Sequence, residues 1–392
     1  MKSITPIFKI AESESECVES LRLVAEVFSS SSSLFDYEEY KQRLWSEDPS
    51  FDRNNLILTV GSDGEIIGVI RIVPSILYRV NKPIAVAGIS SVCLKENYRG
   101  LGLSTPMMSF ALGECRRRGY EIAALFSRRV LDHYYCRFGF SGVASYSRIR
   151  FCCPESVRAT ARPGLDIVEC HTAQFEILND LYQRCYGLTF GYVERSLAYW
   201  RFMKRRIEYI GDPVMKAVIL DGVIAGYFML SGDVVCELAA DVDRVDLVDL
   251  ICCIEGVVEK DISELEFSIS PQHVMMASSR WEIDKTISQR SCSYGGHMVN
   301  LLNVEKVFSL WLDRINNICR RVAIRSFSGR FGMVEYSWNG RKFSAAVDQG
   351  ASALDYQTTC LLLGCETAHG LPVETPFMLD REPFNTPLAD HF

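Results

Sequence analysis

Runs of apolar residues separated by short polar turns predict a series of strands and one helix in the first third of the chain. Residues 55–80 contain two apolar runs interrupted by the tetrapeptide GSDG, a pattern typical of a β-hairpin. A further strand is expected at 84–94 and a helix at 104–118, where apolar side chains recur at helical spacing. Gly119 stands where helices commonly stop, and residues 121–126 predict another buried strand. The order of these elements predicts a mixed α/β fold.

The remainder of the chain continues the mixture of strands and helices. With 392 residues and about 150 residues per domain, two or three domains are expected. Two prolines and mixed polar residues near 153–164 indicate a first boundary. The elements expected beyond it are a helix-like stretch at 182–206, strands at 214–220 and 223–230, a helix at 307–320 and a strand pattern at 330–347.

Composition narrows the class of protein. A net charge of −7 argues against a nucleic-acid partner and favours small cationic ones. The 15 cysteines form no C-x-x-C motif and are an odd number, so we expect free thiols in a reducing compartment and no metal site. No apolar run reaches the length of a membrane span and no signal peptide is expected, which together predict a cytoplasmic protein without membrane partners.

The most specific motif is the turn RGLGLS at residues 99–104, between the third predicted strand and the helix. Gly100 and Gly102 allow the backbone to approach a large anion, and the exposed amides and helix start would attract it. Arg99 can add a charge-assisted contact. The turn lacks the third glycine of a dinucleotide fingerprint and the G-K-[ST] of a P-loop. It therefore predicts a diphosphate site of another kind, the alternative being an ordinary turn with Ser104 as helix cap.

A second motif, YYCRFGF, occupies residues 134–140. Together with the strand and the turn it resembles the GNAT superfamily of acyl-coenzyme A dependent N-acyltransferases. The resemblance implies that the turn binds the coenzyme diphosphate and that the strand ending at Leu94 pairs with the pantetheine arm. It also implies that Tyr135, from the pattern Y-x-x-x-G-F, protonates the departing thiolate; Tyr134 is the rival acid. The residues expected to bind the coenzyme are Val92, Cys93, Leu94, Arg99, Gly100, Leu101, Gly102, Leu103 and Ser104.

The length of the chain and three later stretches resemble the enhanced intracellular survival (Eis) type of this superfamily. These stretches are Arg195 with Trp200, MVNLLNV at residues 298–304 and LLLG at residues 361–364. The resemblance implies tandem GNAT folds, an active one at 1–153 and a degenerate one at 154–296, and a sterol-carrier-protein-like α/β domain at 297–392. It further implies that the terminal carboxylate of Phe392 is the general base, with Asp390 and His391 as rivals. A ring-like homo-oligomer, with a hexamer as one expectation, comes from the same resemblance.

The expected function is transfer of an acetyl group from acetyl-CoA to a primary amine of a cationic small molecule, aminoglycoside-like or another amine. A biosynthetic enzyme acting on an amino sugar, amino acid or peptide amine, with a different acyl group, would share the same motifs. A lipid or small-ligand binding protein is the alternative from another class. Two departures from the family pattern, Ser91 in the strand and Ser104 in the turn, bear on the acceptor and on helix packing.

Overall fold

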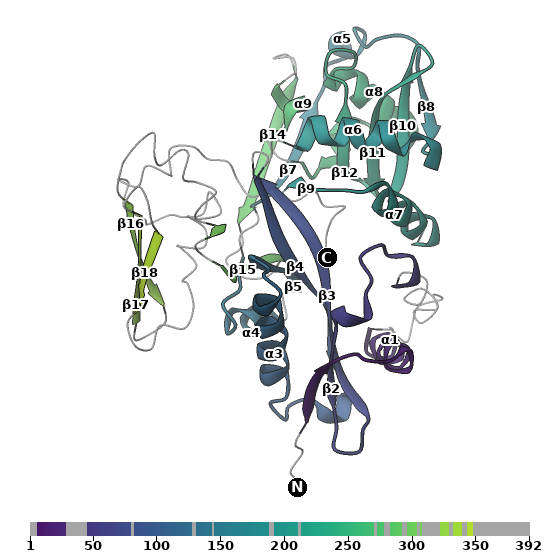
Figure 1. Ribbon diagram of the computed structural model, residues 1–392. Coiled ribbons are helices and arrows are strands. Elements are labelled where there is room, and N and C mark those ends of the chain that lie inside the picture. The colour runs from purple at the N-terminus through teal and green to yellow at the C-terminus, as the bar shows by residue number, and fades with distance from the viewer. Residues whose placement is uncertain are drawn as a thin grey trace.

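The computed structural model describes residues 6–28, 45–79, 82–127, 131–142, 145–187, 192–210, 213–269, 273–277, 283–291, 296–303, 306–307, 322–328, 332–338 and 343–347. The strands of these residues form three sheets, and the two larger ones each have helices on both faces (Figure 1). The predicted mixed α/β fold is confirmed.

The first sheet has the order β1-β2-β3-β4-β5-β15-β6, and β9 also pairs with β3. Its strands are β1 (Ile7–Ile10), β2 (Leu56–Val60), β3 (Ile66–Arg79), β4 (Lys82–Leu94), β5 (Ile122–Ser127), β6 (Ser141–Gly142), β9 (Tyr192–Val193) and β15 (Gly296–Leu301). The short helices near it are η1 (Arg53–Asn55), η2 (Glu96–Tyr98) and α4 (Asp132–Cys136). The predicted hairpin, third strand and following strand are confirmed as β2, β3, β4 and β5.

Helices α1 (Glu14–Phe28) and α3 (Ser104–Arg117) cover opposite faces of this sheet. Successive residues of a strand point to opposite faces. Leu56 and Leu58 accordingly pack in the cluster under α1, whereas Ile57 between them packs in the cluster under α3. Burial on both faces explains why these strands are continuous apolar runs rather than alternating ones.

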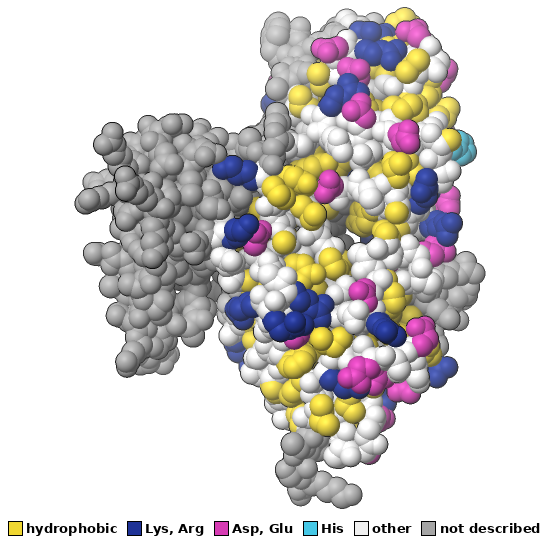
Figure 2. Space-filling model, in the orientation of Figure 1, with side chains coloured by type: hydrophobic (Ala, Val, Ile, Leu, Met, Phe, Trp, Pro, Cys, Tyr) yellow, Lys and Arg dark blue, Asp and Glu magenta, His cyan; other side chains and the backbone are white. Residues whose placement is uncertain are grey.

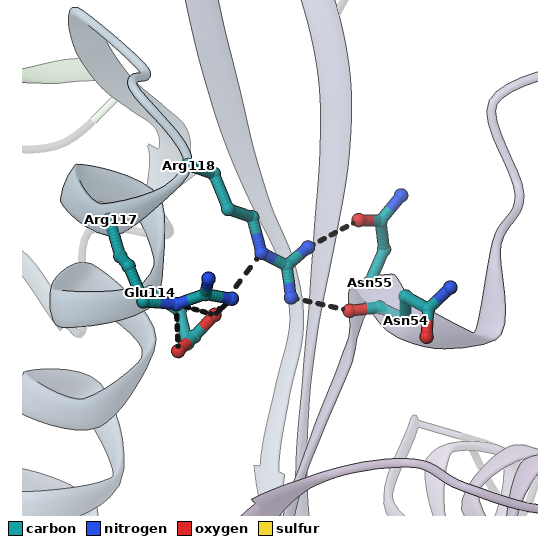
Figure 3. Close-up of polar contacts among 5 residues, drawn as sticks. All are labelled: Asn54, Asn55, Glu114, Arg117 and Arg118. Carbon is teal, nitrogen blue, oxygen red and sulfur yellow. Dashed lines mark hydrogen bonds and ion pairs between the residues drawn. The ribbon is translucent and has the colours of Figure 1, made fainter.

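Arg118 fixes the carboxyl-terminal end of α3 to the start of β2 (Figure 3). Its guanidinium donates to the Asn55 side-chain oxygen at 2.7 Å and to the Asn54 carbonyl at 2.6 Å. Glu114 accepts hydrogen bonds from Arg118 and from Arg117, at 3.2 Å and 2.7 Å. Positive side chains at this end also complement the helix dipole. The predicted helix and its stop at Gly119, where φ is +82°, are confirmed.

The second sheet has the order β14-β7-β13-β12-β11-β10-β8. Its strands are β7 (Ser145–Cys152), β8 (Leu165–Glu169), β10 (Val214–Leu220), β11 (Val223–Ser231), β12 (Val234–Ala240), β13 (Glu266–Phe267) and β14 (Asp284–Ser291). Helix α8 (Leu247–Val258) covers one face, and α6 (Phe175–Tyr186) and α7 (Leu197–Ile210) cover the other. The short helices α5 (Glu155–Arg158), η4 (Thr172–Gln174), η5 (Ile262–Glu264) and α9 (Val274–Ala277) complete this unit.

The predicted helix-like stretch at 182–206 is wrong as a single element. The structure divides it into the end of α6, strand β9 and most of α7. Residues Tyr192 and Val193 leave the helical path because they pair with Tyr78 and Leu77 of β3 in the other sheet. A long-range strand pairing therefore overrides the local apolar periodicity.

The two large sheets exchange strands along the chain. Strand β7 precedes the predicted domain bound at 153 yet joins the second sheet, where it pairs with β14 over eight residues. Strand β15 follows the second unit yet joins the first sheet, where all six of its residues pair with β5. The bounds 1–153, 154–296 and 297–392 remain a prediction about domains. The first sheet takes strands from all three of these ranges, and the second sheet takes β7 from the first of them.

The third sheet consists of β16 (Val322–Ser328), β17 (Gly332–Trp338) and β18 (Phe343–Val347), paired antiparallel in that order. The strand pattern predicted at 330–347 is confirmed by β17 and β18. The helix predicted at 307–320 lies, apart from its first residue, outside the described residues.

His273, at the start of α9, is buried with 1% of its surface exposed, and its Nδ1 accepts a hydrogen bond from the Met275 amide at 3.2 Å. Burial lowers the pKa of His273 to about 4. The unfolded chain binds a proton near pH 6.5, so the stability supplied by the neutral ring is present above pH 6.5 and lost as pH falls towards 4. We expect a loss of about 3 kcal/mol over that window, because each pH unit of difference corresponds to about 1.4 kcal/mol.

Urea unfolding at pH 7 and pH 4 measures this loss in the parent and in His273→Phe, which keeps an aromatic ring beside Tyr186, 4.6 Å away. The variant should lose much less stability on acidification. Equal losses of stability in both proteins would show that protonation of His273 does not cause the loss at low pH.

Candidate active site

The centre of the first sheet contains a fork. Strands β4 and β5 run parallel and pair only at Val86–Ile122, Ala87–Ala123 and Gly88–Ala124. Beyond Gly88, β4 continues to Leu94 and β5 to Ser127, and no further pair joins them in the described residues. The outer edge of β5 is occupied by β15. The fork therefore opens at the carboxyl ends of two parallel strands, where ligands of α/β sheets bind.

A β-bulge interrupts β4 beside this fork. Val69 pairs with Cys93 and Arg71 with Ser90, so Ser91 and Val92 together oppose Ile70. Ser91 has φ +52°, a left-handed conformation that non-glycine residues adopt rarely and often at functional sites. A bulge leaves backbone groups without partners in the ladder. It lies directly before Cys93 and Leu94, the end of the strand expected to bind the pantetheine arm.

The turn after β4 has the bare backbone that the sequence predicts. Gly100 and Gly102 have φ of +77° and +78°, and a Cβ added at either would meet no atom within 4 Å. The amides of residues 100–103 donate no hydrogen bond within the part of the chain that the structure describes. Leu103 is the N-cap of α3 and makes no capping hydrogen bond through its side chain. The alternative interpretation, Ser104 as helix cap, is therefore wrong, because Ser104 is already the first helical residue.

Arg99 connects the turn to the end of β4. Its Nε donates to the carbonyl of Leu94 at 3.2 Å, and its side chain is exposed. The two terminal nitrogens of the guanidinium remain available for an anion. The turn thus offers backbone donors, a helix start and one cation within six residues.

The second motif contacts the turn through Tyr134. The Tyr134 hydroxyl donates to the Ser104 carbonyl at 3.1 Å, which ties α4 to the first turn of α3. The neighbouring Tyr135 ring lies edge-on to Tyr134 at 4.9 Å and is 7% exposed. Its hydroxyl makes no hydrogen bond within the described residues, and burial raises the pKa of Tyr135 to about 12. Of the two rivals, Tyr135 is thus the one with an uncommitted hydroxyl.

The structure brings together the residues predicted at the coenzyme site: Val92, Cys93, Leu94, Arg99, Gly100, Leu101, Gly102, Leu103 and Ser104 all lie between the fork and the start of α3. The proposed bases in the tail, Asp390, His391 and Phe392, lie outside the described residues. In the described part, no group of three or more His, Cys, Asp or Glu side chains is placed to hold a metal ion. None of the described helices is long and apolar enough to cross a bilayer.

The sequence did not indicate a second hollow, between β3 and the segment linking β9 to α7. It has a volume of about 310 Å³, and the exposed residue Glu194 is among its lining residues. The stretch around Glu194 has no motif and no clear periodicity, so only the pairing of β9 with β3 reveals it. On the face shown in Figure 2, acidic and basic side chains are interspersed.

Part of the chain matches a known protein family. Residues 10–143 match the family model of the acetyltransferase (GNAT) domain, so this part of the chain carries a GNAT acetyltransferase domain. A search among curated proteins found no match.

Solved structures share the fold over most of the chain. A GCN5-related N-acetyltransferase from Kribbella flavida is 16% identical with a TM-score of 0.62, covering 100% of this chain and 99% of its own. A GCN5-related N-acetyltransferase from Anabaena variabilis is 16% identical with a TM-score of 0.60, covering 91% and 89%. Eis1 from Mycobacterium abscessus is 13% identical with a TM-score of 0.59, covering 92% and 90%. At these identities the likeness shows the fold alone.

Proposed function

We propose that the protein is an N-acyltransferase that moves an acetyl group from acetyl-CoA to a primary amine of a small cationic molecule. One observation carries the proposal: a forked pair of parallel strands opens directly onto a turn with bare amides and a helix start, inside a unit that matches the GNAT domain. A thioester-bearing carrier with a diphosphate fits both parts at once.

Residues of the turn would hold the diphosphate, and the end of β4, residues 92–94, would pair with the amide groups of the pantetheine arm. The thioester would then lie near the bulge at Ser91. A neutral amine attacks the thioester carbonyl carbon, and the resulting oxyanion is stabilised by backbone N–H groups of the bulge. The C–S bond breaks, and Tyr135 gives its proton to the thiolate.

The amine must lose a proton before or during attack, because an alkylammonium has a pKa of about 10. The base proposed from the family resemblance is the terminal carboxylate of Phe392, with Asp390 and His391 as alternatives. Assembly into a homo-oligomer is proposed on the same ground, and a cytoplasmic location is proposed because the cysteines are expected to be free thiols.

Gly102→Ala tests the coenzyme site. A Cβ at φ +78° costs roughly 1–2 kcal/mol, and the backbone is expected to relax and turn its amides away. We expect the Kd for coenzyme A to rise at least about tenfold, the equivalent of about one charge-assisted hydrogen bond. Isothermal titration calorimetry with coenzyme A measures this, and release of free thiol from acetyl-CoA in the presence of an amine panel measures transfer.

Gly222→Ala is the matched control. Gly222 has φ +74° and open space at its Cβ, but it lies in the hairpin between β10 and β11 of the second sheet. It should cost similar stability and leave coenzyme affinity unchanged. Failure of the parent protein to bind coenzyme A, or equal affinities in both variants, would refute the proposed site.

A further inference from the structure

Arg137, the residue that follows α4, holds its guanidinium in a restrained position at the surface. The residue is exposed, and its Nε donates to the Tyr134 carbonyl at 3.4 Å. The guanidinium carbon lies 4.9 Å from the centre of the Tyr134 ring and 5.9 Å from that of Phe138, distances at which a cation is attracted to an aromatic ring. These contacts restrain the side chain before any ligand binds, which lowers the entropy cost of binding.

The charge of Arg137 is not neutralised by a carboxylate in the part of the chain that the structure describes, where its side chain hydrogen-bonds only to Tyr134. By contrast, Arg117 and Arg118 at the far end of α3 both pair with Glu114. The two terminal nitrogens of the Arg137 guanidinium are therefore not occupied by any described residue. Their planar arrangement suits two oxygens of one phosphate group.

A short chain of contacts joins Arg137 to the glycine turn. The Tyr134 ring, beside which the guanidinium lies, carries the hydroxyl that donates to the carbonyl of Ser104 at 3.1 Å. Ser104 is the first residue of α3 and the last residue of the turn. One aromatic side chain thus separates the guanidinium from the helix start, and an anion that extends from the turn past Tyr134 would meet Arg137.

Coenzyme A carries more negative charge than the turn alone can offset. The proposed function places its diphosphate on the amides of the turn beside Arg99, the only cation in the sequence RGLGLS. A further phosphate, on the 3′ oxygen of the ribose, is a phosphomonoester with a charge of about −1.5 to −2 at pH 7. One ribose separates this phosphate from the diphosphate, as one tyrosine ring separates Arg137 from the helix start.

We infer that Arg137 binds the 3′-phosphate of the coenzyme, so that the protein distinguishes coenzyme A from carriers that lack this phosphate. The inference rests on the proposed function, because it takes the diphosphate to lie at the turn. The two terminal nitrogens of Arg137 donate to phosphate oxygens, while Tyr134 and Phe138 keep the guanidinium in place. Arg137 is thus a residue of donor specificity and takes no part in the chemical step.

Coenzyme A and dephospho-coenzyme A, which differ only in the 3′-phosphate, test the inference. Isothermal titration calorimetry at pH 7 should show the parent binding coenzyme A at least about tenfold more tightly, as expected for one hydrogen bond to a charged group. Arg137→Met keeps an apolar stem beside the Tyr134 ring and removes the guanidinium. In this variant the Kd for coenzyme A should rise to that for dephospho-coenzyme A, and the Kd for dephospho-coenzyme A should stay as in the parent.

Arg116→Met is the matched control for the loss of one positive charge. Arg116 is also an exposed arginine, in the last turn of α3 and roughly 18 Å from Ser104 along the helix. This variant should keep the full preference for coenzyme A. Because both arginines are exposed, both variants should fold as the parent does, and a thermal unfolding curve checks this.

The outcomes separate this inference from the proposed function. Equal affinities of the parent for the two carriers, or a preference retained in Arg137→Met, would overturn the role of Arg137 and leave the coenzyme site at the turn. A preference lost in Arg116→Met as well would show a general effect of net charge and would also overturn it. If the parent bound neither carrier, the coenzyme site itself would be refuted.

Discussion

Replacement of Tyr135 by phenylalanine should lower kcat by about 10²- to 10⁴-fold, the usual contribution of a general acid, with little change in the Kd for acetyl-CoA. The ring is buried among side chains of α3 and the first sheet, so phenylalanine keeps the packing and removes only the hydroxyl. Because burial raises the pKa of Tyr135 to about 12, the phenol stays protonated at neutral pH. Loss of this proton should therefore depress the rate only as the pH approaches 12. Single-turnover measurements with acetyl-CoA and an amine give the required rates.

Tyr134→Phe is the control for this experiment. Its hydroxyl is committed to the Ser104 carbonyl, and losing that hydrogen bond should cost about 1 kcal/mol of stability. Its effect on kcat should be small beside that of Tyr135→Phe. A Tyr135→Phe enzyme as fast as the parent, or a larger loss of kcat in Tyr134→Phe, would show that a group other than Tyr135 protonates the departing thiolate.

The second large effect concerns stability. Glu237→Gln should lower the free energy of unfolding by about 3–5 kcal/mol, since it leaves the Arg195 guanidinium buried without its counter-charge. The pair is enclosed completely: both side chains have 0% exposure, Tyr227 donates to Glu237 at 2.7 Å, and the guanidinium lies 3.8 Å from the Tyr182 ring centre. Urea unfolding at neutral pH measures the loss.

Two further variants define the cause of that loss. Glu266→Gln removes a carboxylate that pairs with Arg148 and Arg150, both more than half exposed, and should cost no more than about 1 kcal/mol. The double variant Arg195→Met, Glu237→Leu replaces the ion pair by apolar groups and should recover most of the stability. A loss below about 1 kcal/mol for Glu237→Gln would show that Arg195 finds another partner or is reached by water.

The parts of the fold that the sequence predicts correctly are those decided by neighbours along the chain. The hairpin before Arg79, the glycine turn and the helix that stops before Gly119 each follow from local patterns of apolar residues and turn residues. The bare amides at Gly100 and Gly102 were likewise predictable, because a left-handed backbone conformation requires glycine there.

Long-range pairings account for what the sequence did not predict. Nothing local shows that β9 leaves the second unit to pair with β3, which breaks the predicted helix and creates the hollow at Glu194. The hydrogen bond from Tyr134 to Ser104, which leaves Tyr135 as the uncommitted phenol, likewise depends on how α4 packs against α3. The role of Phe392 depends on the path of a tail outside the described residues.

The insertion of β15 between β5 and β6 has a consequence for biosynthesis. Residues up to Gly142 contain every other strand of the first sheet except the short β9, but the edge of β5 is covered only by residues 296–301. During translation the outer edge of β5 therefore keeps an unsatisfied row of amides and carbonyls until residues 296–301 have left the ribosome. Such an edge invites pairing with other chains. The nascent chain has to delay completion of its first sheet until the second sheet's strands have been made.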